Sequence, residues 1–129
     1  MRILITGGNG YIAQSLIKGL SLFPYDITYI TRKDFDLTDK EATDKWFKKT
    51  PYFDVVIHTA TKGGSRLKKD TGEVCYQNLQ MFQNLIYNKN HYGKLIQFGS
   101  GAELSQPSSP YGLSKKIIND LCQSINHFY

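Results

Sequence analysis

Residues 2–13 read Arg2-Ile3-Leu4-Ile5-Thr6-Gly7-Gly8-Asn9-Gly10-Tyr11-Ile12-Ala13, in which an apolar run leads directly into a glycine cluster. The apolar run predicts a short buried strand, and the glycines predict a tight loop that re-enters as a helix. Gly7 permits the turn, Gly10 leaves room for a ligand to approach the backbone, and Ala13 lets the helix pack closely on the strand. Because the first N–H groups of such a helix attract anions, the stretch favours a pyrophosphate-binding loop, with a plain strand-to-helix turn as the alternative.

The composition of the chain is that of one globular domain. Its 129 residues fit a single domain, and a hydrophobic content of 40% is enough for a packed core. No apolar run approaches the length of a membrane span, and an expected strand already begins at residue 2, so we expect no leader sequence. Cys75 and Cys122 lack metal-ligand spacing and are interpreted as buried, reduced thiols. We therefore expect a cytoplasmic protein with no metal site and no membrane partner.

The charge pattern does not indicate nucleic-acid binding. The formal net charge is +5, but the basic residues are scattered among acidic ones and accompany no nucleic-acid-binding motif. One basic cluster stands in an expected loop over residues 59–72 and consists of Lys62, Arg66, Lys68 and Lys69. It is either a solvated loop or a contact for the phosphate of a small ligand.

Strand and helix signals alternate along the chain. Runs of β-branched, aromatic and aliphatic residues predict strands at 26–31, 54–58 and 94–98 and a minimal strand at 35–37. A capping-box spacing at Thr38 and Glu41 predicts a helix that ends before Pro51. The apolar stripes expected on the helices are Ile12, Leu16, Leu20 and Phe23; Ala42, Trp46 and Phe47; Val74, Asn78, Phe82 and Leu85; and Ile117, Leu121 and Ile125.

This alternation predicts an α/β fold with a doubly wound parallel sheet, because each right-handed crossover places a helix on a face of the sheet. Numbered in chain order, the five expected strands lie in the Rossmann-like order 3-2-1-4-5. A crevice then opens beside the first strand, at the carboxyl ends of the strands. We expect residues 1–129 to form a single dinucleotide-binding domain of this kind.

A second candidate site consists of Ser100 and the segment Pro110-Tyr111-Gly112-Leu113-Ser114-Lys115. On a helix that begins at Pro110, Tyr111 and Lys115 share one face, about 6 Å apart along the axis. An ammonium group near a tyrosine favours the phenolate, which can exchange a proton with a sugar hydroxyl while hydride moves to or from a nicotinamide. Ser100 follows an expected strand and can reach the same crevice. The alternative is a packed tyrosine beside a solvated lysine.

Together these segments closely resemble the extended short-chain dehydrogenase/reductase family of NAD(P)-dependent sugar-nucleotide epimerases, dehydratases and reductases. Residues 6–13 are similar to its cofactor loop T-G-G-x-G-[FY]-I-[GA], and residues 110–115 to its catalytic helix P-Y-G-x-S-K. Asp36-Leu37-Thr38-Asp39 and His58-Thr59-Ala60 resemble its D-[LI]-x-D and H-x-A segments. Ser100 matches its catalytic serine or threonine, and Asn78 matches its helical asparagine.

The resemblance implies a role for each matching residue. Tyr111 would be the acid/base, Lys115 would tune it and hold the nicotinamide ribose, and Ser100 would orient the substrate. Asn78 would be linked to the proton relay. The cofactor would be bound by residues of both sites, with Asp36 at the adenine: Gly7, Gly10, Tyr11, Ile12, Arg32, Asp36, Leu37, Ala60 and Lys115.

Arg32 and Lys33 favour NADP over NAD as the cofactor. They stand at the end of the second expected strand, where many dinucleotide-binding folds carry an acid that binds the ribose 2′-hydroxyl. A guanidinium suits a 2′-phosphate through its charge and its forked donors, although an exposed turn with two solvated cations is the alternative. Residues 31–34 and 60–64 also resemble GDP-fucose synthases, which are nucleotide-sugar reductases.

Three departures from the family bear on activity. Ala102 stands where GDP-fucose synthases carry a cysteine that acts as an acid in epimerisation, and the loop from Ser100 to Tyr111 is shorter than usual. Family members also continue beyond the catalytic helix into a smaller lobe that grips the sugar nucleotide, so we expect a truncated domain.

Two functions therefore stay open. The first is an NADP-dependent enzyme acting on a sugar nucleotide, and the second is a truncated or degenerate cofactor-binding module without independent activity. The residues favour the first and the length favours the second, because substrate without a covering lobe is weakly held. A homodimer through the last two long helices is also expected, since relatives pair these helices and Ile118 and Phe128 stand outside the expected core.

Overall fold

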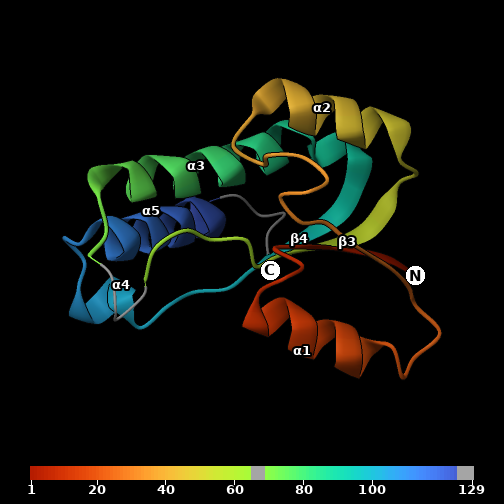
Figure 1. Cartoon of the computed structure of the whole chain (residues 1–129), viewed down its shortest axis with the longest axis horizontal. Helices are drawn as coiled ribbons and strands as arrows, with labels where there is room; N and C mark the ends of the chain where they lie inside the picture. The colour runs from red at the N-terminus through yellow and green to blue at the C-terminus, as the bar shows by residue number, and fades with distance from the viewer. Residues whose placement is uncertain (65–68, 125–129) are drawn as a thin grey trace.

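A parallel sheet of four strands forms the centre of the molecule (Figure 1). The computed structural model describes residues 1–64 and 69–124. The strands are β1 (Arg2–Thr6), β2 (Asp26–Tyr29), β3 (Phe53–His58) and β4 (Tyr92–Gln97). The helices are α1 (Tyr11–Leu20), α2 (Lys40–Lys49), α3 (Gly72–Tyr87), α4 (Ala102–Ser105) and α5 (Pro110–Ser124), with a 3₁₀ turn at Lys89–His91.

The strand order is β2-β1-β3-β4, and each neighbouring pair is parallel. This order confirms the predicted arrangement of the four longer strands around the first one. The register places Thr6 of β1 beside His58 of β3, and His58 beside Gln97 of β4. The carboxyl ends of the three strands therefore lie together, next to the loops that follow them.

The minimal edge strand predicted at residues 35–37 is wrong, because this segment pairs with no strand. The Asp36 carboxylate instead accepts hydrogen bonds from the Thr38 amide at 2.9 Å and the Thr38 hydroxyl at 2.7 Å. The Leu37 carbonyl accepts a hydrogen bond from Asn84 Nδ2 at 2.8 Å. Side chains thus satisfy backbone groups that a sheet ladder would otherwise have used.

Helices cover both faces of the sheet, as the doubly wound prediction required. The helix α1 packs on one face against Ile3, Ile5 and Ile57. Helices α2, α3 and α5 lie on the other face, where the larger core includes Phe47, Leu85 and Ile118, and Figure 1 shows α1 on the opposite side from α2 and α3. No helix within residues 1–64 and 69–124 is long and apolar enough to cross a membrane.

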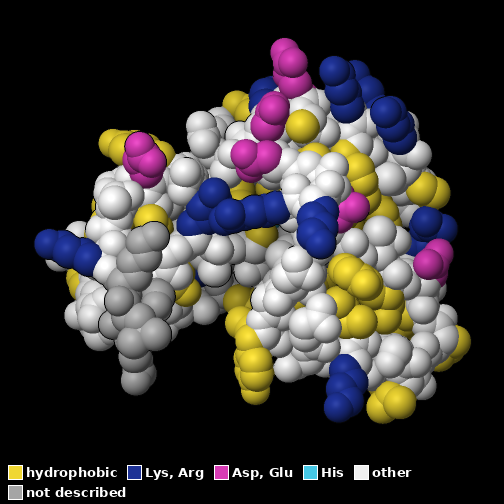
Figure 2. All heavy atoms as spheres, viewed as in Figure 1, with side chains coloured by type: hydrophobic (Ala, Val, Ile, Leu, Met, Phe, Trp, Pro, Cys, Tyr) yellow, Lys and Arg dark blue, Asp and Glu magenta, His cyan; other side chains and the backbone are white. Residues whose placement is uncertain are grey.

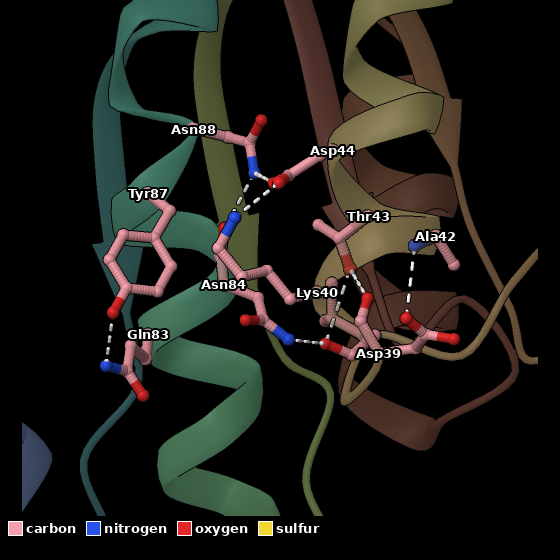
Figure 3. Close-up of polar contacts among 10 residues, drawn as sticks. Asp39, Lys40, Ala42, Thr43, Asp44, Gln83, Asn84, Tyr87 and Asn88 are labelled. Carbon is pink, nitrogen blue, oxygen red and sulfur yellow. Dashed lines mark hydrogen bonds and ion pairs between the residues drawn. The ribbon is translucent and has the colours of Figure 1, made fainter.

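Buried amide side chains join α3 to α2 (Figure 3). Asn88 Nδ2 donates to Asp44 Oδ1 at 2.9 Å and to the Asn84 carbonyl at 2.8 Å.

The cap of α2 is Asp39, whose carboxylate accepts the Ala42 amide at 3.2 Å. The predicted capping box at Thr38 is therefore wrong by one residue, because the Thr38 hydroxyl is bonded to Asp36.

Two of the predicted apolar stripes also differ from the structure. The helix α1 ends at Leu20 rather than at Phe23, which is 56% exposed in the following turn. On α5 the buried positions are Ile118 and Cys122, whereas Leu121 is 42% exposed. The remaining predicted position on that helix, residue 125, and Phe128 lie outside the described residues.

The buried face of α5 is shifted by one residue from the predicted face, because it includes small and polar side chains. A Cβ at Gly112 would overlap the Gln106 carbonyl oxygen and come within 2.7 Å of the Ala102 carbonyl oxygen. This contact fixes which side of α5 faces α4, and Ser114 and Lys115 turn inward with it. Since Ile118 is only 2% exposed, it offers no surface for a second copy, contrary to the expectation from the sequence.

Candidate functional site

The glycine loop connects β1 to α1 in the predicted conformation. Gly7 has a φ of +69°, and a Cβ there would lie 2.8 Å from the Ala60 backbone. The Gly10 amide closes the turn by donating to the Gly7 carbonyl at 2.8 Å. Position 7 therefore needs glycine both for its backbone conformation and for its close contact with the segment that follows β3.

Thr6 holds that segment against the glycine loop. Its hydroxyl oxygen accepts the amides of Thr59 and Ala60, both at 3.1 Å. With its acceptor sites used, the Thr6 hydroxyl donates its proton to His58 Nδ1 at 2.7 Å, which assigns the imidazole proton to Nε2. Burial lowers the pKa of His58 to about 3, with the Lys115 charge as a second cause, so the imidazole is neutral at physiological pH.

A cavity of about 570 Å³ opens at the carboxyl ends of β1, β2 and β3. Eight of the nine residues predicted to bind cofactor line it: Gly7, Gly10, Tyr11, Ile12, Arg32, Asp36, Leu37 and Ala60. The ninth, Lys115, is not in its lining. The structure thus brings together residues from four separate segments of the chain, as the predicted crevice required.

The cavity wall also contains residues that sequence reasoning did not assign to the cofactor, among them Lys62 and Met81. The sequence signals for Lys62 are its place in a basic cluster that is either a solvated loop or a phosphate contact, and in the segment 60–64 that resembles GDP-fucose synthases. Met81 lies on the apolar face of α3 and carries no local signal for binding. Arg66 and Lys68 of the same basic cluster lie outside the described residues.

Positive charge surrounds one carboxylate at the cavity. Hydrogen bonds from the Thr38 hydroxyl and then from the Thr38 amide lower the pKa of Asp36, and the charges of Lys62 and Arg32 lower it further. Arg32 and Lys33 follow β2 and are exposed. Lysine and arginine side chains also gather across the middle of the face shown in Figure 2.

Tyr111 and Lys115 lie together on α5, as predicted from their spacing. Lys115 Nζ lies 5.8 Å from the centre of the Tyr111 ring and donates to the Phe98 carbonyl at 3.4 Å. Burial lowers the pKa of Lys115, and the negative charge of Glu103 acts in the opposite direction. This lysine is a buried cation beside a half-buried phenol, so the solvated lysine considered from the sequence is wrong.

Ser100 begins the turn that leads into α4. Its hydroxyl oxygen accepts the Ala102 amide at 3.2 Å, and its carbonyl accepts the Glu103 amide at 3.1 Å. The Ser100 amide donates back to Glu103 Oε2 at 2.6 Å. These contacts close the turn before α4, whose N-cap is Gly101 and has no side-chain cap. The S-x-x-E spacing at residues 100–103 was the sequence signal for the contact between Ser100 and Glu103. The Ser100 hydroxyl proton takes no part in these contacts.

Asn78 joins the loop after β3 to α5. Its Oδ1 accepts the Lys62 amide at 2.8 Å, and its Nδ2 donates to the Lys62 carbonyl at 3.0 Å. The same Nδ2 donates to Ser114 Oγ at 3.1 Å, and this hydroxyl in turn donates to the Tyr111 carbonyl at 2.7 Å. Asn78 therefore contacts the backbone around the predicted site.

One short loop connects the cavity to Tyr111. Ala60, Thr61 and Lys62 line the cavity, while an ideal Cβ on Gly64 would lie 3.0 Å from the Tyr111 ring. The predicted catalytic residues do not line the cavity themselves. Asn78 and Tyr111 contact the loop that does, whereas the hydrogen bonds of Ser100 and of the Lys115 ammonium are with other segments. In the described part of the chain, no three His, Cys, Asp or Glu side chains gather as metal ligands would.

Solved structures similar to this chain include reductases and synthases of nucleotide sugars. A GDP-mannoheptose C4 reductase from Campylobacter jejuni with NADP bound has a TM-score of 0.83 at 25% identity, over 97% of this chain and 46% of that one. A GDP-D-glycero-L-gluco-heptose synthase from the same organism, in the presence of NADPH, has a TM-score of 0.84 at 25% identity, over 97% and 43%. A GDP-L-fucose synthetase from Naegleria fowleri bound to NADP shares the fold, with a TM-score of 0.76 at 21% identity, over 97% and 44%.

The chain spans less than half the length of these three structures. A model of the NAD dependent epimerase/dehydratase family matches residues 3–129, which is nearly the whole chain. The match includes both the glycine loop and the tyrosine–lysine helix, the two segments on which the predicted resemblance rested. By fold, by motif and by family model, this chain belongs to the NAD dependent epimerase/dehydratase family.

Proposed function

We propose that this chain binds NADP(H) in the cavity beside the glycine loop and acts in hydride transfer at a carbon of a nucleotide-linked sugar. The observation that carries the proposal is the convergence of eight predicted residues on one cavity. Family membership and neighbours that contain NADP support a nicotinamide cofactor. The neighbours at 25% identity are described as acting on GDP-linked heptoses, which supports a nucleotide sugar as the substrate class.

The start of α1 fits the pyrophosphate of a dinucleotide. Its N-cap, Gly10, provides no side-chain cap, and the first turn of the helix contains no acidic residue. The N–H groups of that turn are therefore left for an external anion, and they are next to the cavity. Arg32 and Lys33, with Lys62 opposite, supply the cations that a 2′-phosphate requires, so NADP is favoured over NAD.

The nicotinamide supplies or accepts the hydride when it is bound. In our proposal, the Tyr111 phenol moves a proton to or from the sugar oxygen, and the Lys115 ammonium stabilises the phenolate and holds the ribose. Ser100 can donate its hydroxyl proton to the same sugar oxygen, because its contact with the Ala102 amide uses only a lone pair. Asn78 is bonded both to the loop between the cavity and Tyr111, at Lys62, and to α5, at Ser114.

A cofactor-binding module without turnover is the second candidate. One observation favours it: eight of the predicted cofactor residues line the cavity, whereas Ser100, Tyr111, Lys115 and Asn78 do not. A second copy could pack on α3 and α5, where Tyr76 and Leu121 are 71% and 42% exposed. In either case we place the protein in the cytoplasm, and cofactor binding is the activity that both candidates share.

Calorimetric titration with NADPH and NADH tests the proposal, with Gly10→Asp as the diagnostic variant. The aspartate would cap α1 itself and place a negative charge where the pyrophosphate binds. NADPH binding should therefore fall at least about tenfold while the helix keeps or gains stability. Ser15→Asp adds the same charge to the exposed side of α1 and should leave binding unchanged. Failure of the parent chain to bind either cofactor would refute the proposal.

A further inference from the structure

The carboxylate of Glu103 lies at the segment that connects Ser100 to Lys115. Its Oε2 accepts the Ser100 amide at 2.6 Å. The same oxygen lies 2.9 Å from the position that a Cβ on Gly99 would occupy, so it sits directly against the Gly99 backbone. Lys115 Nζ is bonded to the carbonyl of Phe98, the preceding residue. The Lys115 ammonium and the Glu103 carboxylate are thus bonded to neighbouring peptide units in residues 98–100.

Among the residues that the structure describes, Glu103 supplies the negative charge that raises the pKa of Lys115. His58 on β3 is neutral, since burial lowers its pKa to about 3. Tyr111 stands one turn earlier on the same helix. The helix α3 packs on α5 and carries Cys75, and burial raises the pKa of this thiol. The charged residues Glu73 on α3, and Lys116 and Asp120 on α5, are exposed.

We propose that Glu103 is a positioning residue of the Ser100–Lys115 site, with two separable effects. Through its hydrogen bond with the Ser100 amide it fixes the backbone of Ser100, and through its charge it stabilises the buried ammonium of Lys115. The inference rests on the proposed function only in treating Ser100 and Lys115 as catalytic. The two effects can be separated because the side-chain oxygen of glutamine can also accept the Ser100 amide but carries no charge.

The test is the pH titration of Lys115 in the full chain without cofactor, followed by NMR of isotopically labelled lysine side chains and assigned with Lys115→Arg. In Glu103→Gln the Lys115 signal should titrate at lower pH than in the parent, because burial then acts without the opposing carboxylate. Glu41→Gln removes an equal charge from the first turn of α2 and should leave the Lys115 titration where it is in the parent. Backbone amide spectra verify that both variants remain folded.

An unchanged Lys115 titration in folded Glu103→Gln would overturn the electrostatic part of the proposal. For the positioning part, Glu103→Ala should speed hydrogen exchange at the Ser100 amide, and Glu103→Gln should restore slow exchange. Equal exchange in Glu103→Ala and the parent would overturn that part. These measurements use no cofactor, so they are independent of the NADPH titration that tests the proposed function.

Discussion

The starts of α1 and α2 show two ways of satisfying the same backbone groups. The helix α2 is capped by its own residues, with Asp39 accepting the Ala42 amide and Glu41 in the first turn. The helix α1 begins at a glycine, without a side-chain cap and without an acid in its first turn. The first N–H groups of α2 are capped by the protein's own side chain, whereas those of α1 face a cavity. The difference separates a structural helix from one suited to bind an anion.

The largest expected effect is a loss of stability when the turn before α1 is disrupted at Gly7. In Gly7→Val, a β-branched side chain must adopt a positive φ and its Cβ lies 2.8 Å from the Ala60 backbone. We expect the free energy of unfolding to fall by at least about 2 kcal/mol in urea titration. Gly19→Ala is the matched control in α1, because a Cβ there meets nothing within 4 Å, and it should stabilise the helix. Equal stability of Gly7→Val and the parent would contradict the close contact.

A second effect concerns the histidine behind the α1 start. The folded-state pKa of His58 is about 3, below its ordinary value of 6.5, so the unfolded chain binds a proton first as the pH falls. The contribution of neutral His58 to stability is therefore complete above pH 6.5 and is lost progressively as the pH falls toward 3. Urea titrations between about pH 6.5 and 5 should show a falling free energy of unfolding in the parent. The slope should be shallower in His58→Asn, and equal slopes would show that His58 does not cause it.

The smallest expected effect is at the α2 cap. Asp39→Ala should lower the free energy of unfolding by about 1 kcal/mol, because the Ala42 amide loses its acceptor. Asp39→Asn retains a capping oxygen and should recover most of the loss. Neither variant should change NADPH affinity, since Asp39 is absent from the cavity lining. A marked loss of NADPH affinity in Asp39→Ala would show that the two helix starts are not independent.

The sequence predicted those features that depend on local pattern. The glycine loop, the buried strands and the spacing of Tyr111 and Lys115 are short-range signals, and the order of parallel strands follows from their crossovers. The cavity lining could therefore be named in advance from Gly7, Arg32 and Ala60. These residues are distant in sequence, but each follows a strand of the same sheet.

Features that depend on long-range polar contacts could not be predicted in this way. The periodicity of apolar residues on α5 does not show that Ser114 and Lys115 are buried, because a period read from apolar residues carries no information on polar ones. Residues 35–37 resemble a strand, but the Leu37 carbonyl is bonded to the side chain of Asn84, 47 positions away, and the Asp36 carboxylate accepts the Thr38 amide and hydroxyl.

The two asparagines of α3 set the spacing of the cavity walls. The Asn78 side chain accepts a hydrogen bond from the Lys62 amide, and the Asn84 side chain donates one to the Leu37 carbonyl. Six residues of helix separate these anchors, a rise of about 9 Å that thermal motion hardly alters. One helix thus fixes the distance between the two loops that carry Lys62 and Leu37. The width of the cavity opening between these loops therefore depends on the geometry of α3.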